Sequence, residues 1–342
     1  SVVRQLAWGP EPDSLVPEVP FPSASASRVA APALEGAIAG VNLFTQFEGL
    51  HFVPHATLAS HGGSDVVEVR RRITSGEWTW QHRGLPVAMV EDATGTGVFV
   101  FVPRQEELWH AGSVLQFRPG TRREPLDGLP APGPTVPLVE ARLTRVWEED
   151  RLAILTMPGE AMEDFWVWEN LLGSHPTFGR RVHSLVTPDS SAGTEAFLRL
   201  GVASTSEAAH LLTVDLNGNR LGQQGWSGIA RRTLELSVPA GWLRPGTNEL
   251  VIGSGGDRTS LVYVDSMALT YRTTSRTQRA DQVLEAAATG ALAWAGTAAE
   301  RPMVWDVTDP WNPRSHAVVW RSGAWMAAVE AGRRYVATRG VD

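Results

Sequence analysis

Apolar and polar residues alternate through most of residues 165–271. Segments 196–202 and 211–216 each place every second side chain on one face, which is the period of a half-buried β-strand. Asn217 and Gly218 follow directly, and both residue types tolerate the positive φ angles of a two-residue hairpin turn. This stretch is therefore predicted to form a β-sandwich with a hairpin at its centre.

The region before this sandwich is expected to hold a separate β domain. Residues 41–121 contain strand-like segments, including 66–69 and 98–102, between glycine-rich turns. Residues 1–40 are rich in proline and alanine and are predicted to form an arm. Proline cannot donate to a sheet ladder, so the proline-rich residues 122–137 are predicted to be a linker.

The jelly-roll-like sandwich is predicted to span residues 138–272. The remaining residues, 273–342, are expected to form a short helix and a small β module. The helix is placed at 279–288 because these residues are rich in alanine and Gly290 follows as a C-terminal cap. The predicted fold class is all-β: a multi-domain β-sandwich or jelly roll with few short helices.

Several motifs occur in a definite order in the second half of the chain. They are Trp166-Val167-Trp168, then residues 214–222, 245–250, 262–271 and 304–310. The order of the first four resembles the jelly-roll module that lies upstream of the catalytic domain in gingipain-like cysteine peptidases, family C25. Residues 304–310 are similar to the short segment that precedes the peptidase domain in this family. The resemblance implies a secreted protein, extracellular or at the cell surface after removal of a signal peptide. It also implies a following catalytic domain as a partner.

The peptidase activity itself cannot be transferred by this resemblance. The family uses a cysteine nucleophile, and this sequence contains no Cys. We therefore expect a non-enzymatic chain, either the N-terminal part of a C25-like peptidase precursor or a relative that never had the enzyme.

Charge and hydropathy exclude two classes of partner. The net charge of -7 argues against nucleic acid, and short basic groups such as Arg231-Arg232 are expected to be solvated. No run of about 18 apolar residues is present, so no transmembrane helix is predicted.

Three histidines, His51, His55 and His61, form the densest group of metal-ligating side chains. A zinc site built on a helix needs two histidines four residues apart, but Pro54 interrupts the first pair. No metal site is therefore predicted.

Carboxylates offer two further candidates. Glu163, Asp164 and Glu169 contain enough carboxylates for glycosidase chemistry, but acidic positions flanking a strand are the simpler interpretation. Residues 215–219 match the start of a calcium loop, yet its distal Glu is absent. No cofactor is predicted; a jelly roll can bind calcium elsewhere, with ligands that the sequence does not name.

The 14 Trp residues suggest two kinds of binding surface, although most are expected in the core. Trp226, in a glycine-rich segment, is the best candidate for exposure and, with Trp166 and Trp168, for stacking on a glycan. The second surface lies at the chain end, where residues 333–339 are predicted to form an open strand edge that recruits another chain or a second copy. Its expected interface residues are Tyr335, Trp320 and Trp325. The leading interpretation is a scaffold or assembly module, and the alternative is a carbohydrate-binding jelly roll.

Overall fold

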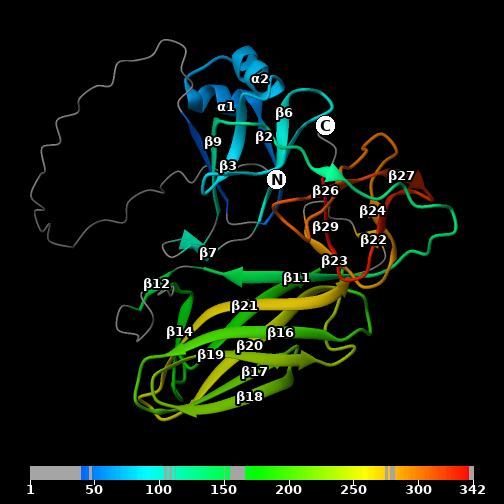
Figure 1. The fold of residues 1–342 in the computed structure, drawn as a ribbon. Helices are drawn as coiled ribbons and strands as arrows, with labels where there is room; N and C mark the ends of the chain where they lie inside the picture. Colours follow the sequence, from blue (N-terminus) through cyan, green and yellow to red (C-terminus); the bar gives the residue numbers. More distant parts are fainter. Residues whose placement is uncertain are drawn as a thin grey trace, which may run out of the picture.

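The computed structural model describes residues 40–45, 48–103, 106–107, 110–111, 113–149, 151–154, 166–273, 276–277 and 282–338. It is 57% strand and 6% helix, with two short helices, so the predicted all-β class is confirmed. The N-terminal part lies above the jelly roll in Figure 1, and the C-terminal module, in orange and red, lies beside both. The predicted arm falls almost wholly outside the described residues.

The N-terminal part contains two sheets and both helices. One sheet has the order β1 (Val41–Thr45), β9 (Ser113–Pro119), β3 (Trp78–His82) and β4 (Leu85–Pro86). The other has the order β2 (Gly49–Pro54), β6 (Gly97–Val102) and β5 (Met89–Glu91). The remaining elements are helices α1 (His55–Gly62) and α2 (Val66–Thr74) and a small pair, β7 (Glu106–Glu107) and β8 (His110–Ala111).

The strand expected at residues 66–69 is wrong, because these residues begin helix α2. The Asp65 side chain caps the helix by accepting a hydrogen bond from the Glu68 amide at 2.7 Å. Val69 and Ile73, four residues apart, are both fully buried on the same helical face. Val69 therefore packs on the buried face of an amphipathic helix despite the preference of valine for strands.

The jelly roll consists of two facing sheets. The first has strands β14 (Glu169–Leu172), β21 (Leu261–Thr273), β11 (Ala141–Glu148), β16 (Ala196–Ser204) and β19 (Ala230–Val238). The second has the order β15 (Arg180–Thr187), β20 (Gly246–Gly256), β17 (Ala209–Leu216) and β18 (Asn219–Ser227). A two-stranded pair, β12 (Leu152–Ala153) and β13 (Trp166–Val167), lies beside them.

The predicted hairpin at the centre of the sandwich is confirmed. Asn217 and Gly218 join β17 to β18 with φ angles of 50° and 81°. The alternation predicted for the flanking strand is also present, since Leu212, Val214 and Leu216 are buried in the core between the sheets.

The C-terminal module extends the first jelly-roll sheet and adds a second one. Beyond β11, the extension continues with β23 (Leu284–Ala286), β29 (Arg334–Ala337), β25 (Val304–Asp306), β26 (Arg314–His316) and β10 (Leu126–Asp127). The added sheet has the order β22 (Arg276–Thr277), β24 (Gly290–Ala295), β28 (Ala324–Val329) and β27 (Val318–Arg321).

The helix predicted at 279–288 is not present in its described part, where β23 forms instead. This strand pairs with β11 on one side and β29 on the other, and Leu284 and Ala286 are buried. Pairing on both edges outweighs the helix preference of an alanine-rich segment. Residues 279–281 lie outside the described part.

The proline-rich residues 122–137 are not a free linker but a strap bound to the C-terminal module. Leu129 and Pro137 accept hydrogen bonds through their carbonyls from Ala317 N (3.0 Å) and Ala291 N (2.9 Å). Proline lacks an N–H group but keeps its carbonyl, so a proline-rich strap can still accept bonds from a sheet.

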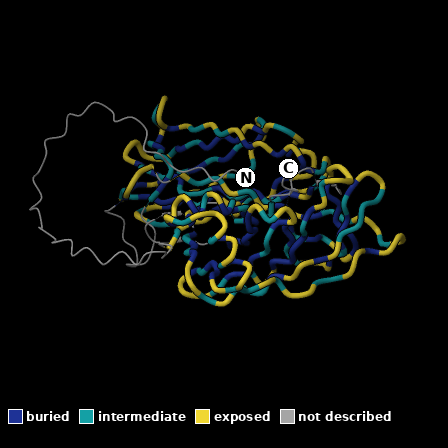
Figure 2. Tube along the Cα trace, turned by 90° about the horizontal axis from the view of Figure 1, so that it is seen from above, coloured by how far each residue is buried: buried dark blue, intermediate teal, exposed yellow. Residues whose placement is uncertain are grey.

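The C-terminal module joins the other two parts through shared cores. Leu284, Trp294 and Tyr335 belong to the jelly-roll core. Trp305 and Val336 pack instead with apolar residues of the N-terminal part. Figure 2 shows buried residues running through the interior of the described chain, with exposed residues along its loops.

Candidate functional site

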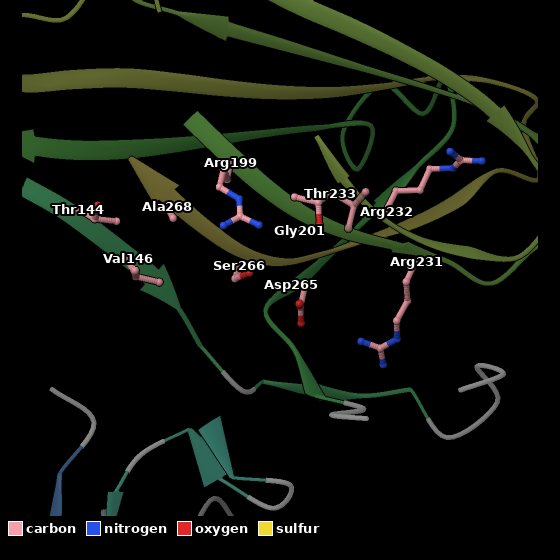
Figure 3. Close-up of a pocket in the computed structure, with 11 residues that line it drawn as sticks. Thr144, Val146, Arg199, Gly201, Arg231, Arg232, Thr233, Asp265, Ser266 and Ala268 are labelled. Atoms are coloured by element: carbon pink, nitrogen blue, oxygen red, sulfur yellow. The ribbon is translucent and has the colours of Figure 1, made fainter. Parts of the chain in front are cut away.

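A pocket of about 520 Å³ lies on the outer face of the first jelly-roll sheet (Figure 3). Strands β11, β21, β16 and β19 contribute its lining, which mixes polar and apolar groups and contains no aromatic ring, His or Cys. The lining residues are Thr144, Val146, Arg199, Gly201, Val202, Arg231, Arg232, Thr233, Asp265, Ser266 and Ala268.

Strand alternation builds this pocket. In β16, Leu198 and Leu200 are buried in the sandwich core, so the intervening Arg199 lies on the outer face. Gly201 and Ser266 both line the pocket. A Cβ atom at position 201 would lie only 2.8 Å from Ser266 Oγ, so the glycine keeps this space open. The register of β16 and β21 shifts next to Gly201, at a β-bulge that redirects the neighbouring side chains.

The charged groups of the pocket differ in how they are held. Arg199 lies 3.6 Å from Glu235, but both side chains are about 60% exposed, so this ion pair is weak. Arg232 stacks on a ring instead, with its guanidinium carbon 5.9 Å from the Trp226 ring centre. In Figure 3, Arg199 and Arg231 extend from either side of Asp265.

This arrangement suits the binding of a polar ligand. Guanidinium groups donate several hydrogen bonds, while carboxylate and hydroxyl oxygens accept them. Thr233 and Ser266 add hydroxyl groups to the lining. A ligand rich in hydroxyl or carboxylate groups would match this set. The sequence motifs do not point to any of these residues as a ligand-binding residue. Arg231 and Arg232, expected from the sequence to be solvated, line the pocket.

Trp226 is not exposed, so its predicted role as a glycan platform is wrong. Only 8% of its surface is accessible. Its Nε1 donates a hydrogen bond to Ser204 Oγ at 3.0 Å, and its ring lies 5.1 Å from that of His210. The glycine-rich segment that suggested a loop is strand β18, and alternation turns Trp226 toward the core.

The other two predicted aromatic residues are partly buried and do not line the pocket. Trp166 begins β13, and the Trp168 ring lies 4.8 Å from that of His183. The neighbouring Glu169 contacts His183 Nε2 at 2.7 Å and Arg181 Nε at 3.1 Å. Glu169 is therefore held in an ion-pair cluster, while Glu163 and Asp164 lie outside the described residues.

The open edge predicted at residues 333–339 is wrong for residues 333–338, and residue 339 lies outside the described part of the chain. Strand β29 lies inside its sheet, paired with β23 and β25, because segments before it in the sequence fold onto both its sides. Tyr335 is fully buried rather than at an interface, and its hydroxyl accepts a hydrogen bond from Glu330 N at 2.9 Å. Burial raises the pKa of Tyr335 to about 12.

Strand β27 forms one edge of the other sheet of the C-terminal module, and β22 forms its opposite edge. Trp320 lies in β27 and Trp325 lies opposite it in β28. Both are partly exposed, and their rings meet edge to face at 5.5 Å. The Trp325 Nε1 donates a hydrogen bond to the Thr297 carbonyl at 2.9 Å.

The three histidines of the N-terminal part lie on different elements. His51 is in β2, His55 begins α1 directly after Pro54, and His61 is near the end of that helix. His55 is almost fully buried, and burial lowers its pKa. Among the described residues, no three His, Cys, Asp or Glu side chains are grouped closely enough to hold a metal ion.

Asp215, whose segment matches only the start of a calcium loop, pairs with Arg220 across the hairpin. None of the helices in the described ranges combines the length and apolar character needed to cross a membrane.

No protein-family model matches this sequence, and no curated protein matches it. Among solved structures, dimeric latent PorU from Porphyromonas gingivalis is similar with a TM-score of 0.66 and 9% identity. The similarity covers 88% of this chain and 32% of PorU, so the chain spans about a third of that protein. At this identity the comparison establishes a shared fold, consistent in part with the resemblance noted from the motifs.

Several carbohydrate-binding modules also appear among the similar structures. A family 35 module from an environmental isolate has a TM-score of 0.27 and 17% identity over 38% of this chain and 93% of its own. The module CBM36, in complex with calcium and xylotriose, has a TM-score of 0.21 and 16% identity over 29% of this chain and 87% of its own. TM-scores this low do not establish a shared fold or function for this chain.

Proposed function

We propose that this chain is a non-catalytic β-domain module of a larger protein related to C25 peptidases, which is secreted or lies at the cell surface. In that protein, the module acts as an assembly surface for another protein domain or chain. The observation that carries the proposal is the similarity to PorU, which spans 88% of this chain but only 32% of PorU. A region that corresponds to about a third of a longer protein is expected to pack against another protein domain or chain.

Two properties of the chain support this proposal. The sequence contains no Cys, so it cannot supply the thiolate nucleophile of a cysteine peptidase. The β27 edge and the partly exposed Trp320 and Trp325 provide a surface on which a following domain can pack. The proposed assembly surface is therefore the β27 edge, in place of the edge that the sequence predicts at β29.

The natural gene product provides the test. An antibody raised against this chain should detect, in cells that produce it, a protein larger than 37.1 kDa in the surface or culture-medium fraction. Cytosolic and membrane marker proteins would serve as fractionation controls. Detection of only a 37-kDa species in the cytosolic fraction would refute the proposal.

The pocket on the first jelly-roll sheet favours a second candidate function, the binding of a glycan. Its hydroxyl, guanidinium and carboxylate groups can bond to sugar hydroxyls without an aromatic platform. A glycan panel should then show binding that Arg199→Ala weakens at least tenfold. Arg258→Ala, which removes the same charge from an exposed loop, should leave binding unchanged. Absence of binding by the unmodified chain would eliminate this candidate.

A further inference from the structure

Strand β15 forms one edge of the second jelly-roll sheet, and among the strands of the described residues it pairs only with β20. It is eight residues long. An edge strand is usually protected by charges, proline or a covering segment, because its free backbone groups can pair with another chain. Between Val182 and Thr187, β15 has no Asp, Glu, Arg, Lys or Pro.

The hydrogen-bond pattern identifies the backbone groups that face outward. The Ser254 amide donates to the Gly179 carbonyl at 2.7 Å, directly before β15 begins. Bonded and non-bonded pairs alternate along an antiparallel ladder. The odd-numbered residues of β15 therefore bond to β20, and the even-numbered residues direct N–H and C=O toward the free edge. On the other side of β20, Asn217 N donates to the Glu249 carbonyl at 2.8 Å, as this alternation requires.

The same even-numbered residues carry an exposed apolar stripe. Val182 and Val186 are 52% and 47% exposed, and Phe178, just before the strand, is 48% exposed. Ser184 lies between the two valines and is also exposed. In contrast, Leu185 is 1% exposed and faces the core. The outward backbone groups and the apolar stripe thus belong to one set of residues.

This set is symmetrical about Ser184. When a second β15 pairs antiparallel around a two-fold axis at Ser184, Val182 lies opposite Val186 of the second copy and Ser184 lies opposite Ser184. A two-fold interface requires this kind of self-complementary surface. Each bonded pair exchanges two hydrogen bonds, so the three pairs would form about six.

The ends of the strand also match this register. Arg180 would lie opposite Pro188 of the second copy, so the two Arg180 side chains do not meet. Pro188 has no N–H to offer the Arg180 carbonyl, but that carbonyl already accepts a bond from Arg181 Nη1 at 3.4 Å.

We propose that two copies of this chain associate through β15, pairing antiparallel around Ser184 to join their four-stranded sheets into one continuous sheet. The proposal concerns a different surface from the β27 edge and does not depend on the proposed function. It commits to a second copy because the strand is complementary to itself.

Sedimentation velocity between about 1 and 100 μM should show a species of twice the 37.1 kDa chain mass. Val182→Lys places a charged group opposite Val186 of the second copy, within the apolar stripe, and Ser184→Pro removes the central N–H. Each should raise the dimer dissociation constant at least tenfold. Val67→Lys changes a valine that is 78% exposed on α2 and should have no effect.

A cysteine test remains informative if Ser184→Pro impairs folding. The chain has no Cys, so Ser184→Cys introduces one thiol, and bonded antiparallel pairs hold their Cα atoms about 5.5 Å apart, within disulfide range. Mild oxidation should produce a covalent dimer. Ser237→Cys, an exposed serine on edge strand β19, should not. The proposal is overturned by a monomer across the whole range, by a dimer insensitive to Val182→Lys, or by equal cross-linking of both cysteine variants.

Discussion

Replacing Asn248 with alanine should destabilise the jelly roll although this residue lies far from the pocket. Asn248 is fully buried near the start of β20. Its Oδ1 accepts hydrogen bonds from Asn217 Nδ2 at 2.8 Å and Arg244 N at 2.9 Å. Its Nδ2 donates to Thr187 Oγ1 at 3.0 Å and to the Arg244 carbonyl at 2.8 Å. One side chain therefore ties β15, the central hairpin and the 239–245 turn together.

The expected loss follows from these four bonds. A net contribution of about 1 kcal/mol each gives an upper value near 4 kcal/mol. One partner keeps an alternative, since Asn217 Nδ2 also donates to the Trp242 carbonyl at 2.9 Å. The expected cost of Asn248→Ala is therefore about 2 to 4 kcal/mol.

Urea denaturation, followed by circular dichroism, measures this loss. Hydrogen exchange of peptides covering residues 242–250 would locate it in the jelly roll even if the parts of the chain unfold in separate steps. Asn219→Ala, at an exposed position of the same hairpin, is the matched control and should change stability by less than about 0.5 kcal/mol. A loss below about 1 kcal/mol for Asn248→Ala, or equal losses for both variants, would refute the reasoning.

Three further changes test other parts of the fold. Gly218→Val should cost about 1 to 3 kcal/mol, because valine is strained at a positive φ; an unchanged melting temperature would contradict the turn geometry. Trp226→Ala should cost about 3 to 5 kcal/mol in urea denaturation, since it removes a buried ring; a loss below about 1 kcal/mol would mean the ring is exposed. Burial lowers the pKa values of His55 and His316 below 6.5, so the unfolded chain takes up protons first as the pH falls. Stability should therefore decrease below pH 6.5, with a smaller decrease in the His316→Gln variant; urea midpoints that stay constant from pH 7.5 to 5.5 would exclude this linkage.

The features predicted correctly from the sequence are those set by local chemistry. Asn217 and Gly218 specify a turn by their own backbone preferences, and the alternation of residues 211–216 survives because both sheets bury one face. Helix α2 was missed because its valines resemble a strand. The Asp65 cap and the four-residue spacing of Val69 and Ile73 were signals that could have identified it.

The remaining failures depend on contacts between distant segments. Residues 284–286 became a strand through pairing with β11 and β29, which no local preference encodes. The pocket likewise requires Val146, Arg199 and Ser266 to lie side by side in one sheet. Sequence alternation could place each of them on an outer face, but not next to one another.

Assay of the purified chain and of the natural gene product tests the central claim most directly, namely that this is a non-catalytic module of a C25-like protein. The chain alone should not cleave Arg-X peptide substrates, since it has no Cys. The natural product should react with a cysteine-directed peptidase probe at a residue outside this chain. Cleavage by the purified chain, or a natural product with no probe-reactive cysteine, would contradict the claim.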